Sequence, residues 1–148
     1  MGSVTLPAFG DVYVDANAVI YMVESHPDYA PLLVPVWHAA RAGRFRVVTS
    51  HLTLMETLVG PLKNKDAVLV AAYGTLYVSP DLAFLPLSDL VLREAARLRA
   101  VIPALRTPDA LHAATGLVHS CALFLSNDAG FRRIPGLPIT VLSDLLTP

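Results

Sequence analysis

Short, mostly apolar runs alternate along this chain with longer segments of helical character, and this alternation constrains the fold more than any other feature. Five runs are expected to form strands, at residues 12–15, 45–49, 83–85, 122–125 and 139–142. Strands with apolar residues on both sides are buried on both faces, and strands separated by helices pair in parallel. The sequence therefore predicts an α/β fold with a mostly parallel central sheet flanked by helices on both faces.

Segments between the predicted strands have helical spacing and recognisable start and stop residues. The expected helices cover about 17–24, 31–42, a third segment that ends at about 59, 65–77, 88–101 and 107–119, with a short helical turn at 128–131. The third is expected to be capped by either Ser50 or Thr53. Gly60-Pro61 is expected to stop the third of these. Thr107-Pro108 is expected to start the last, with Thr107 at the N-cap and Pro108 in the first turn. The chain has 148 residues, without an internal repeat or a linker. Residues 1–148 are therefore expected to form a single domain.

Four carboxylates stand where this fold can gather them: Asp15, Glu56, Asp109 and Asp128. Asp15 and Asp128 follow predicted strands, at the rim where open parallel sheets bind ligands. Glu56 and Asp109 lie on predicted helices that can pack beside that rim. Carboxylates facing one another repel unless protons or a cation neutralise them, and a set of oxygen ligands suits Mg²⁺ or Mn²⁺. The sequence thus predicts a metal site for phosphoryl transfer.

Two of these acids also suit a purely structural role within their own helix. Thr53 and Glu56 match a capping box, although Leu52, Met55 and Val59 form an apolar stripe beside which Glu56 would face inward. Asp109 also suits the first turn of a helix.

Three polar neighbours can support the acidic site. Asn17 is expected to cap the first helix, or to orient Asp15 or a metal-bound water. Ser126 offers a hydroxyl group beside the site. Asn127, with Asp128, also suits a simple turn.

The sequence gives little support for a zinc site, a catalytic nucleophile or a phosphate-binding loop. The five histidines lack zinc-site spacing, no Ser-His or Cys-His pairing indicates a nucleophile, and no glycine-rich phosphate loop is present. His51 and His112 lie nearest the acids, although a structural role is expected for each histidine. Cys121 lies in an apolar run and is expected to be inert core.

The charge and hydropathy of the chain indicate which kinds of partner it can bind. The net charge is −1, so nucleic acid would have to be attracted by local patches, for which residues 41–46, 93–99 and 132–133 supply arginines. The chain is 54% hydrophobic and 16% charged, where about 25% charged is usual. Either a partner covers part of the apolar surplus or small side chains fill the core. No signal peptide or membrane-spanning run is found, so a cytoplasmic protein without a membrane partner is expected.

Taken in order, four segments resemble the motifs of PIN-domain nucleases. Residues 12–20 resemble the opening strand with its Asp-x-Asn motif, and residues 49–62 the second motif around Glu56. Residues 107–114 resemble the third motif, an Ala-Asp-Ala-x-His-x-Ala pattern, with Pro108 in place of the commoner small residue. Residues 125–137 resemble the fourth, with Ser126 where the family often has threonine. The resemblance covers nearly the whole chain.

The compact length is similar to that of VapC-type toxins of toxin–antitoxin pairs. That resemblance implies an endoribonuclease that uses Mg²⁺ or Mn²⁺, cleaves RNA such as tRNA, forms a homodimer and is inhibited by a small antitoxin. It assigns Asp15 and Asp109 as principal metal ligands and Glu56 and Asp128 as completing the acidic site. Two alternatives stay open: a metal nuclease or phosphatase acting on other phosphodiesters or phosphate esters, and a PIN-like module that binds or assembles without catalysis.

Overall fold

A computed structural model describes residues 2–146, and its strands form one sheet. The strand order is β3-β2-β1-β4-β5, and every pairing is parallel. The strands are β1 (Val12–Val14), β2 (Val47–Ser50), β3 (Ala83–Leu85), β4 (Leu123–Ser126) and β5 (Ile139–Val141). The predicted parallel sheet is therefore confirmed.

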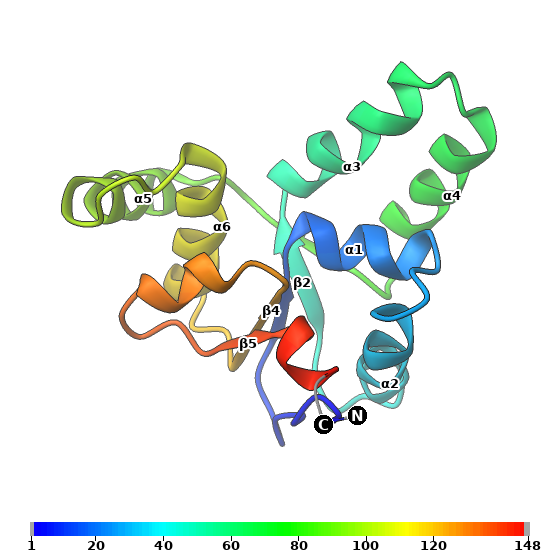
Figure 1. The fold of residues 1–148 in the computed structure, drawn as a ribbon, viewed down its shortest axis with the longest axis horizontal. Helices are drawn as coiled ribbons and strands as arrows, with labels where there is room; N and C mark the ends of the chain where they lie inside the picture. Colours follow the sequence, from blue (N-terminus) through cyan, green and yellow to red (C-terminus); the bar gives the residue numbers. More distant parts are fainter. Residues whose placement is uncertain (1, 147–148) are drawn as a thin grey trace.

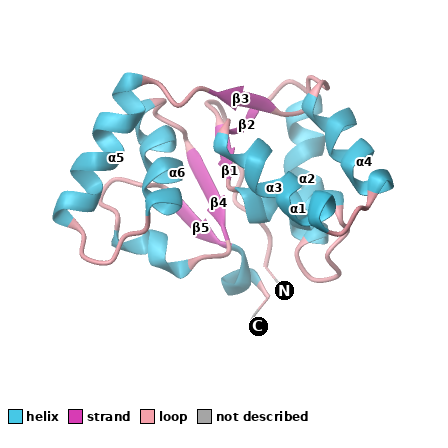
Figure 2. Ribbon diagram, turned by 90° about the horizontal axis from the view of Figure 1, so that it is seen from above, coloured by secondary structure: helices cyan, strands magenta, loops and turns pink. Residues whose placement is uncertain are grey.

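Helices cover both faces of this sheet, as the sequence predicts (Figure 1). They are α1 (Ala16–Val23), α2 (Ala30–Arg41), α3 (Leu52–Lys63), α4 (Ala67–Tyr77), α5 (Asp89–Val101) and α6 (Thr107–Val118), with the 3-10 helices η1 (Ala129–Arg133) and η2 (Leu142–Leu145). Seen from above, α5 and α6 lie on one side of the sheet and α1 to α4 on the other (Figure 2). Within residues 2–146, no helix combines the length and apolar character needed to cross a bilayer.

Each face of the sheet has its own apolar core, which explains why the strands lack polar alternation. Val12 and Val14 of β1 join the core on the side of α1 and α2. Tyr13, between them, joins the core on the side of α5 and α6, where its ring stacks on Phe124 at a centroid distance of 4.6 Å. All three β1 side chains are fully buried. A strand buried on both faces has no position left for a solvated side chain.

The third helix departs from the sequence prediction at its end. Gly60-Pro61 was expected to stop it, but α3 continues through Pro61 to Lys63. Proline removes one helical N–H, while its own carbonyl and that of the preceding residue can still accept hydrogen bonds. The carbonyl oxygens of Gly60 and Pro61 accept from the amides of Asn64 and Asp66, both at 2.9 Å. One lost bond near the end of the helix is therefore tolerated.

The strand order fixes where a ligand can bind. From β1 the chain proceeds outward through β2 to β3, then crosses back to β4 on the other side of β1. After β1 the chain enters α1 on one face, and after β4 it enters η1, whose Phe131 packs in the core of the other face. The segments that leave β1 and β4 thus diverge, opening a crevice at the carboxyl ends of these strands.

Candidate active site

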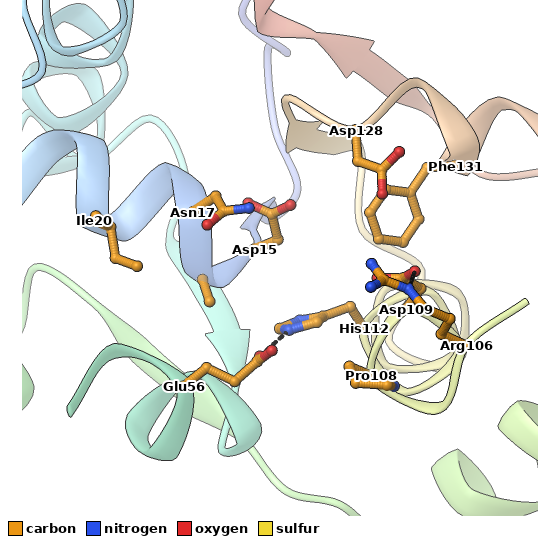
Figure 3. A pocket seen from close by; sticks show the side chains of 11 residues that line it. Asp15, Asn17, Ile20, Glu56, Arg106, Pro108, Asp109, His112, Asp128 and Phe131 are labelled. Carbon is orange, nitrogen blue, oxygen red and sulfur yellow. Dashed lines mark hydrogen bonds and ion pairs between the residues drawn. The ribbon is translucent and has the colours of Figure 1, made fainter. Parts of the chain in front are cut away.

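A pocket occupies this crevice, and all four predicted carboxylates line it. Asp15, Glu56, Asp109 and Asp128 share its wall with Arg106 and His112 (Figure 3). Asn17, Ile20, Pro108 and Phe131 complete most of the lining. Side chains separated by up to 113 positions in sequence therefore meet at one edge of the sheet, as the strand-end argument predicts.

Asp15 is the most deeply placed of the four acids, with only 5% of its surface exposed. It follows β1 directly and caps α1, because its Oδ1 accepts a hydrogen bond from the amide of Ala18 at 3.0 Å. The expectation that Asn17 provides this cap is wrong. Asn17 lies in the first turn of α1, exposed at the pocket wall, because the helix already begins at Ala16.

Burial raises the pKa of the Asp15 carboxyl, and the charge of Glu56 adds to that effect. Hydrogen bonds from Ser126 and the Ala18 amide, together with His112, act in the opposite direction without cancelling it. Burial disfavours the charged form of a carboxyl group, so an ionised Asp15 needs positive charge nearby. A bound cation would supply that charge.

Ser126 connects Asp15 to Asp128. Its hydroxyl donates to Asp15 Oδ2 at 2.5 Å and accepts from the Asp128 amide at 3.0 Å. Asp128 in turn caps η1, since its Oδ1 accepts from the Gly130 amide at 2.7 Å. A Cβ atom at Gly130 would lie 2.9 Å from that oxygen, so the absence of a side chain there permits the close approach. Asp128 therefore serves the turn and the pocket together.

Asn127 does not line the pocket of the four acids. Its Nδ2 donates to the hydroxyl of Tyr21 at 3.3 Å, and its Oδ1 accepts from the Ser143 amide at 2.9 Å. These bonds join the end of β4 to α1 and η2. Asn127 is a supporting residue in the sense that it fixes the strand end from which Ser126 and Asp128 extend.

Glu56 is held by a buried chain of hydrogen bonds. Its Oε1 lies 2.6 Å from His112 Nε2, and His112 Nδ1 lies 2.6 Å from the hydroxyl of Tyr13. That hydroxyl also accepts from the Ser50 amide at 3.2 Å. Burial raises the pKa of Tyr13 well above its ordinary value, so the phenol keeps its proton. His112 therefore links this phenol to the Glu56 carboxylate through its two ring nitrogens.

The capping-box interpretation of Glu56 is therefore wrong. Thr53 lies within α3, and its hydroxyl pairs with that of Thr49 at 2.6 Å. The expected inward stripe is also wrong, because Met55 is 54% exposed and Val59 is 53% exposed. The face of α3 that packs inward instead carries Thr53 and Thr57, both buried, and Glu56 borders it at the pocket.

Asp109 lies in the first turn of α6, where the helix N-terminus favours a carboxylate. Both roles considered for it from the sequence are present, because its side chain is only 19% exposed and also lines the pocket. Its Oδ2 accepts from Arg106 Nε at 3.2 Å. Arg106 is 75% exposed, so this ion pair is screened and contributes little to stability. Thr107 was expected to cap α6, but Arg106 holds that position and makes no capping bond with its side chain.

The donor set fits a hard cation, although the acids do not close a full shell around one point. In the part of the chain that the structure describes, no group of three His, Cys, Asp or Glu side chains is close enough to hold a metal unaided. Each acid is engaged by a protein partner instead: Ser126 at Asp15, His112 at Glu56, Arg106 at Asp109 and the Gly130 amide at Asp128. Mg²⁺ commonly binds through one or two carboxylates and keeps several waters, so a complete protein shell is not required.

Sequence reasoning missed part of this site. The buried chain through Tyr13 and His112 was not foreseen, because the residues that form it come from β1 and α6, 99 positions apart. One signal was present: a tyrosine between two valines in a buried strand needs a partner for its hydroxyl. Of the two histidines near the acids, His112 reaches the pocket, whereas His51 stacks on Phe84 at 5.2 Å and does not line it.

A known domain family and several solved structures are similar to this chain. The sequence matches the PIN domain over residues 12–137. No curated protein matches it significantly. VapBC2 from Rickettsia felis, solved with a DNA fragment of its promoter, is similar with a TM-score of 0.72 at 19% identity, covering 88% of this chain and 98% of that one.

Two further solved structures are similar at comparable coverage. A toxin–antitoxin complex from Klebsiella pneumoniae has a TM-score of 0.65 at 20% identity, covering 88% of this chain and 97% of that one. VapBC-5 of the VapBC toxin–antitoxin family, from Mycobacterium tuberculosis, has a TM-score of 0.57 at 24% identity, covering 91% of this chain and 98% of that one. At these identities the likeness establishes the fold.

Proposed function

Because this chain belongs to the PIN-domain family, we propose that it is a nuclease, as members of that family generally are. The proposed substrate is RNA, with tRNA as the first candidate, and the proposed reaction is hydrolysis of an internal phosphodiester bond. The proposed cofactor is Mg²⁺ or Mn²⁺ in the carboxylate pocket. One observation carries the proposal: a buried Asp15, whose pKa is raised by burial, shares a pocket with three further carboxylates at the crevice of the sheet.

The roles of the side chains follow from their partners. These residues would hold a divalent cation, which would stabilise the negative charge that develops at the phosphate during hydrolysis. Asp15 and Asp109 are the proposed principal ligands, with Asp128 and Glu56 completing the negative wall. Ser126 fixes the orientation of Asp15 through the 2.5 Å bond to Oδ2.

His112 holds Glu56 by one oxygen, and Oε2 of Glu56 has no hydrogen-bond partner within residues 2–146. That oxygen is therefore available to accept a proton from an attacking water. His112 keeps the Glu56 carboxylate oriented through the 2.6 Å contact of its Nε2 with Oε1.

The likeness to toxin–antitoxin complexes supports a further part of the proposal, that this chain is the toxin of such a pair. A small antitoxin and a second copy of the chain are the proposed protein partners. Exposed apolar side chains on and beside α3 and α4 support a covering partner: Met55, Val59, Leu62, Val68 and Val78. Large apolar groups at 53–87% exposure on adjoining elements are unusual for a surface without one.

The test is cleavage of a total tRNA pool by the purified chain in Mn²⁺ and in EDTA. Asp15→Asn removes one carboxylate charge, and Asp28→Asn is a matched control because Asp28 is exposed and does not line the pocket. The expected result is discrete fragments with Mn²⁺ only, retained in Asp28→Asn and lost in Asp15→Asn. Full cleavage by Asp15→Asn would refute the assignment.

The two alternatives predict different results in the same assay. A nuclease for another substrate would leave the tRNA intact but cleave DNA or a small phosphodiester, with the same dependence on Asp15. A non-catalytic module would cleave none of them. The retention of all four acids in one pocket favours the catalytic interpretation over the second alternative.

A further inference from the structure

Most arginine charges of this protein are cancelled by acids of the same chain. Ion pairs join Arg41 to Asp81, Arg46 to Asp11, Arg93 to Asp89, Arg97 to Glu94 and Arg132 to Asp144. These pairs include most of the arginines that the sequence offered as basic patches. A cation already paired with a carboxylate attracts a phosphate weakly, so these residues contribute little to binding of nucleic acid.

Two arginines near the pocket are different, because they bind neutral oxygens. Arg99 donates to the carbonyl of Leu105 at 3.0 Å and to the hydroxyl of Thr107 at 2.9 Å. Arg133 donates to the carbonyls of Gly130 and Pro103, at 3.0 Å and 3.1 Å. Neither forms an ion pair with a carboxylate within residues 2–146. Both therefore keep a full positive charge.

These arginines converge on one segment, the loop between α5 and α6. Arg99 comes from α5 and Arg133 from η1, and both bind carbonyls of residues 103–105. Arg106 follows that segment and lines the pocket, with the pocket carboxylate Asp109 as its partner. We call Arg99 and Arg133 the arginine rim; Arg106 is paired with Asp109 and is not counted in it. The rim lies on the side of the pocket formed by α6 and η1.

The opposite side of the pocket has the reverse character. A second hollow adjoins the pocket there and shares Ile20 and Glu56 with it. Its lining includes Glu24 as well, with no lysine or arginine. The two carboxylates of this hollow disfavour phosphate groups, although Lys63 and Lys65 flank its Asn64.

We propose that the arginine rim binds backbone phosphates of the RNA next to the scissile bond. This inference rests on the proposed function, since it takes RNA as the substrate. Arg99 and Arg133 already orient their guanidinium groups through backbone carbonyls, so little side-chain freedom is lost when a phosphate binds. Their remaining N–H groups can donate to it. The rim explains how a chain of net charge −1 attracts a polyanion to an acidic pocket.

The test measures binding without chemistry. A fluorescein-labelled single-stranded RNA of mixed sequence is titrated with protein in EDTA at several salt concentrations, and fluorescence anisotropy gives the affinity. The Arg99→Gln/Arg133→Gln variant keeps amide donors for the carbonyls but loses two charges. Arg93→Gln/Arg97→Gln is the matched control, on α5 and with the same loss of charge, but at arginines that are paired with acids.

The expected result is a change in salt dependence. Each phosphate contact to a single strand contributes a slope of about 0.7 in log K against log salt, so the rim variant should lose roughly 1.4. The control should keep the slope of the unaltered chain. Equal losses in both variants would reveal only an effect of net charge and would overturn the proposal.

Two further outcomes separate this proposal from the proposed function. Metal-dependent RNA cleavage by the unaltered chain, combined with an unchanged slope in the rim variant, would overturn the rim alone. Absence of RNA binding by the unaltered chain would overturn the rim, and the proposed function would fail separately if that chain also leaves RNA intact in Mn²⁺. Arg99→Lys/Arg133→Lys keeps the charges and should keep most of the slope; if it instead behaves as the glutamine variant does, the residues act by shaping the loop, and the proposal fails.

Discussion

Removing the hydroxyl of Tyr13 is expected to destabilise the protein through two buried groups at once. In Tyr13→Phe the ring keeps its place, since its stacking on Phe124 does not involve the oxygen. The change removes the hydrogen-bond partner of His112 Nδ1 at 2.6 Å and the acceptor of the Ser50 amide at 3.2 Å. Ser50 is fully buried and His112 is 3% exposed, so water does not replace the lost partner.

The magnitude follows from those two orphaned groups. An unsatisfied buried donor or acceptor costs about 1–3 kcal/mol, so the two groups together should lower the free energy of unfolding of Tyr13→Phe by about 2–6 kcal/mol. Most of the lost stability comes from the polar groups, because the apolar ring is unchanged. Tyr29→Phe is the matched control, as the hydroxyl of Tyr29 makes no hydrogen bond within residues 2–146. A surface change of that kind is worth about 0.5 kcal/mol or less.

Urea denaturation followed by circular dichroism measures both variants. The midpoint should fall in Tyr13→Phe, while the dependence of unfolding free energy on urea stays the same, which shows that the native and unfolded states expose the same surface. A loss no larger than that of Tyr29→Phe would refute the reasoning, because it would mean that the chain from Ser50 through Tyr13 to His112 is not formed in solution.

Three other expectations concern the groups around the site. In EDTA at pH 7, Asp15→Asn should unfold at a higher urea concentration than the unaltered chain. Burial raises the pKa of Asp15 in the folded state, so the free energy of unfolding of the unaltered chain falls as the pH rises above about 3.9, the pKa of an aspartate in the unfolded chain. The difference in stability between the two chains should vanish in urea denaturation below about pH 3.9, where Asp15 is protonated in both states. Ser126→Ala should lose about 1–3 kcal/mol in the same assay, since the Asp128 amide loses its acceptor. Burial raises the pKa of Cys121 to about 12, so iodoacetamide should label this thiol at pH 8 only after unfolding, as mass spectrometry would show.

The sheet could be predicted from the sequence because its signal is local and repeated. Each strand is a short apolar run, and burial on both faces imposes that composition. The end of α3 could not be predicted in the same way. Whether Pro61 ends a helix depends on whether the carbonyls around it still find donors, and here Asn64 and Asp66 supply them. That information lies in the fold of the residues that follow.

The acids could be predicted for a related reason, since strand ends in a parallel sheet meet at one edge. Their partners could not. The helix α1 begins at Ala16, one residue earlier than the sequence predicts. Because of that single residue, the N-cap is Asp15 and not Asn17. The pairing of Glu56 with His112 depends on how α3 and α6 lie across the sheet, and no spacing in the sequence encodes it.

The most direct test of the central claim locates the cation itself. Mn²⁺ is paramagnetic and broadens the NMR signals of nearby nuclei, so substoichiometric Mn²⁺ added to the isotope-labelled chain reports where the ion binds. A cation in the carboxylate pocket should selectively broaden the backbone amides of Ala18, Ala110 and Gly130, which adjoin Asp15, Asp109 and Asp128, and this broadening should be lost in Asp15→Asn. Broadening confined to other regions, or equal broadening in Asp15→Asn, would contradict a metal site in the carboxylate pocket.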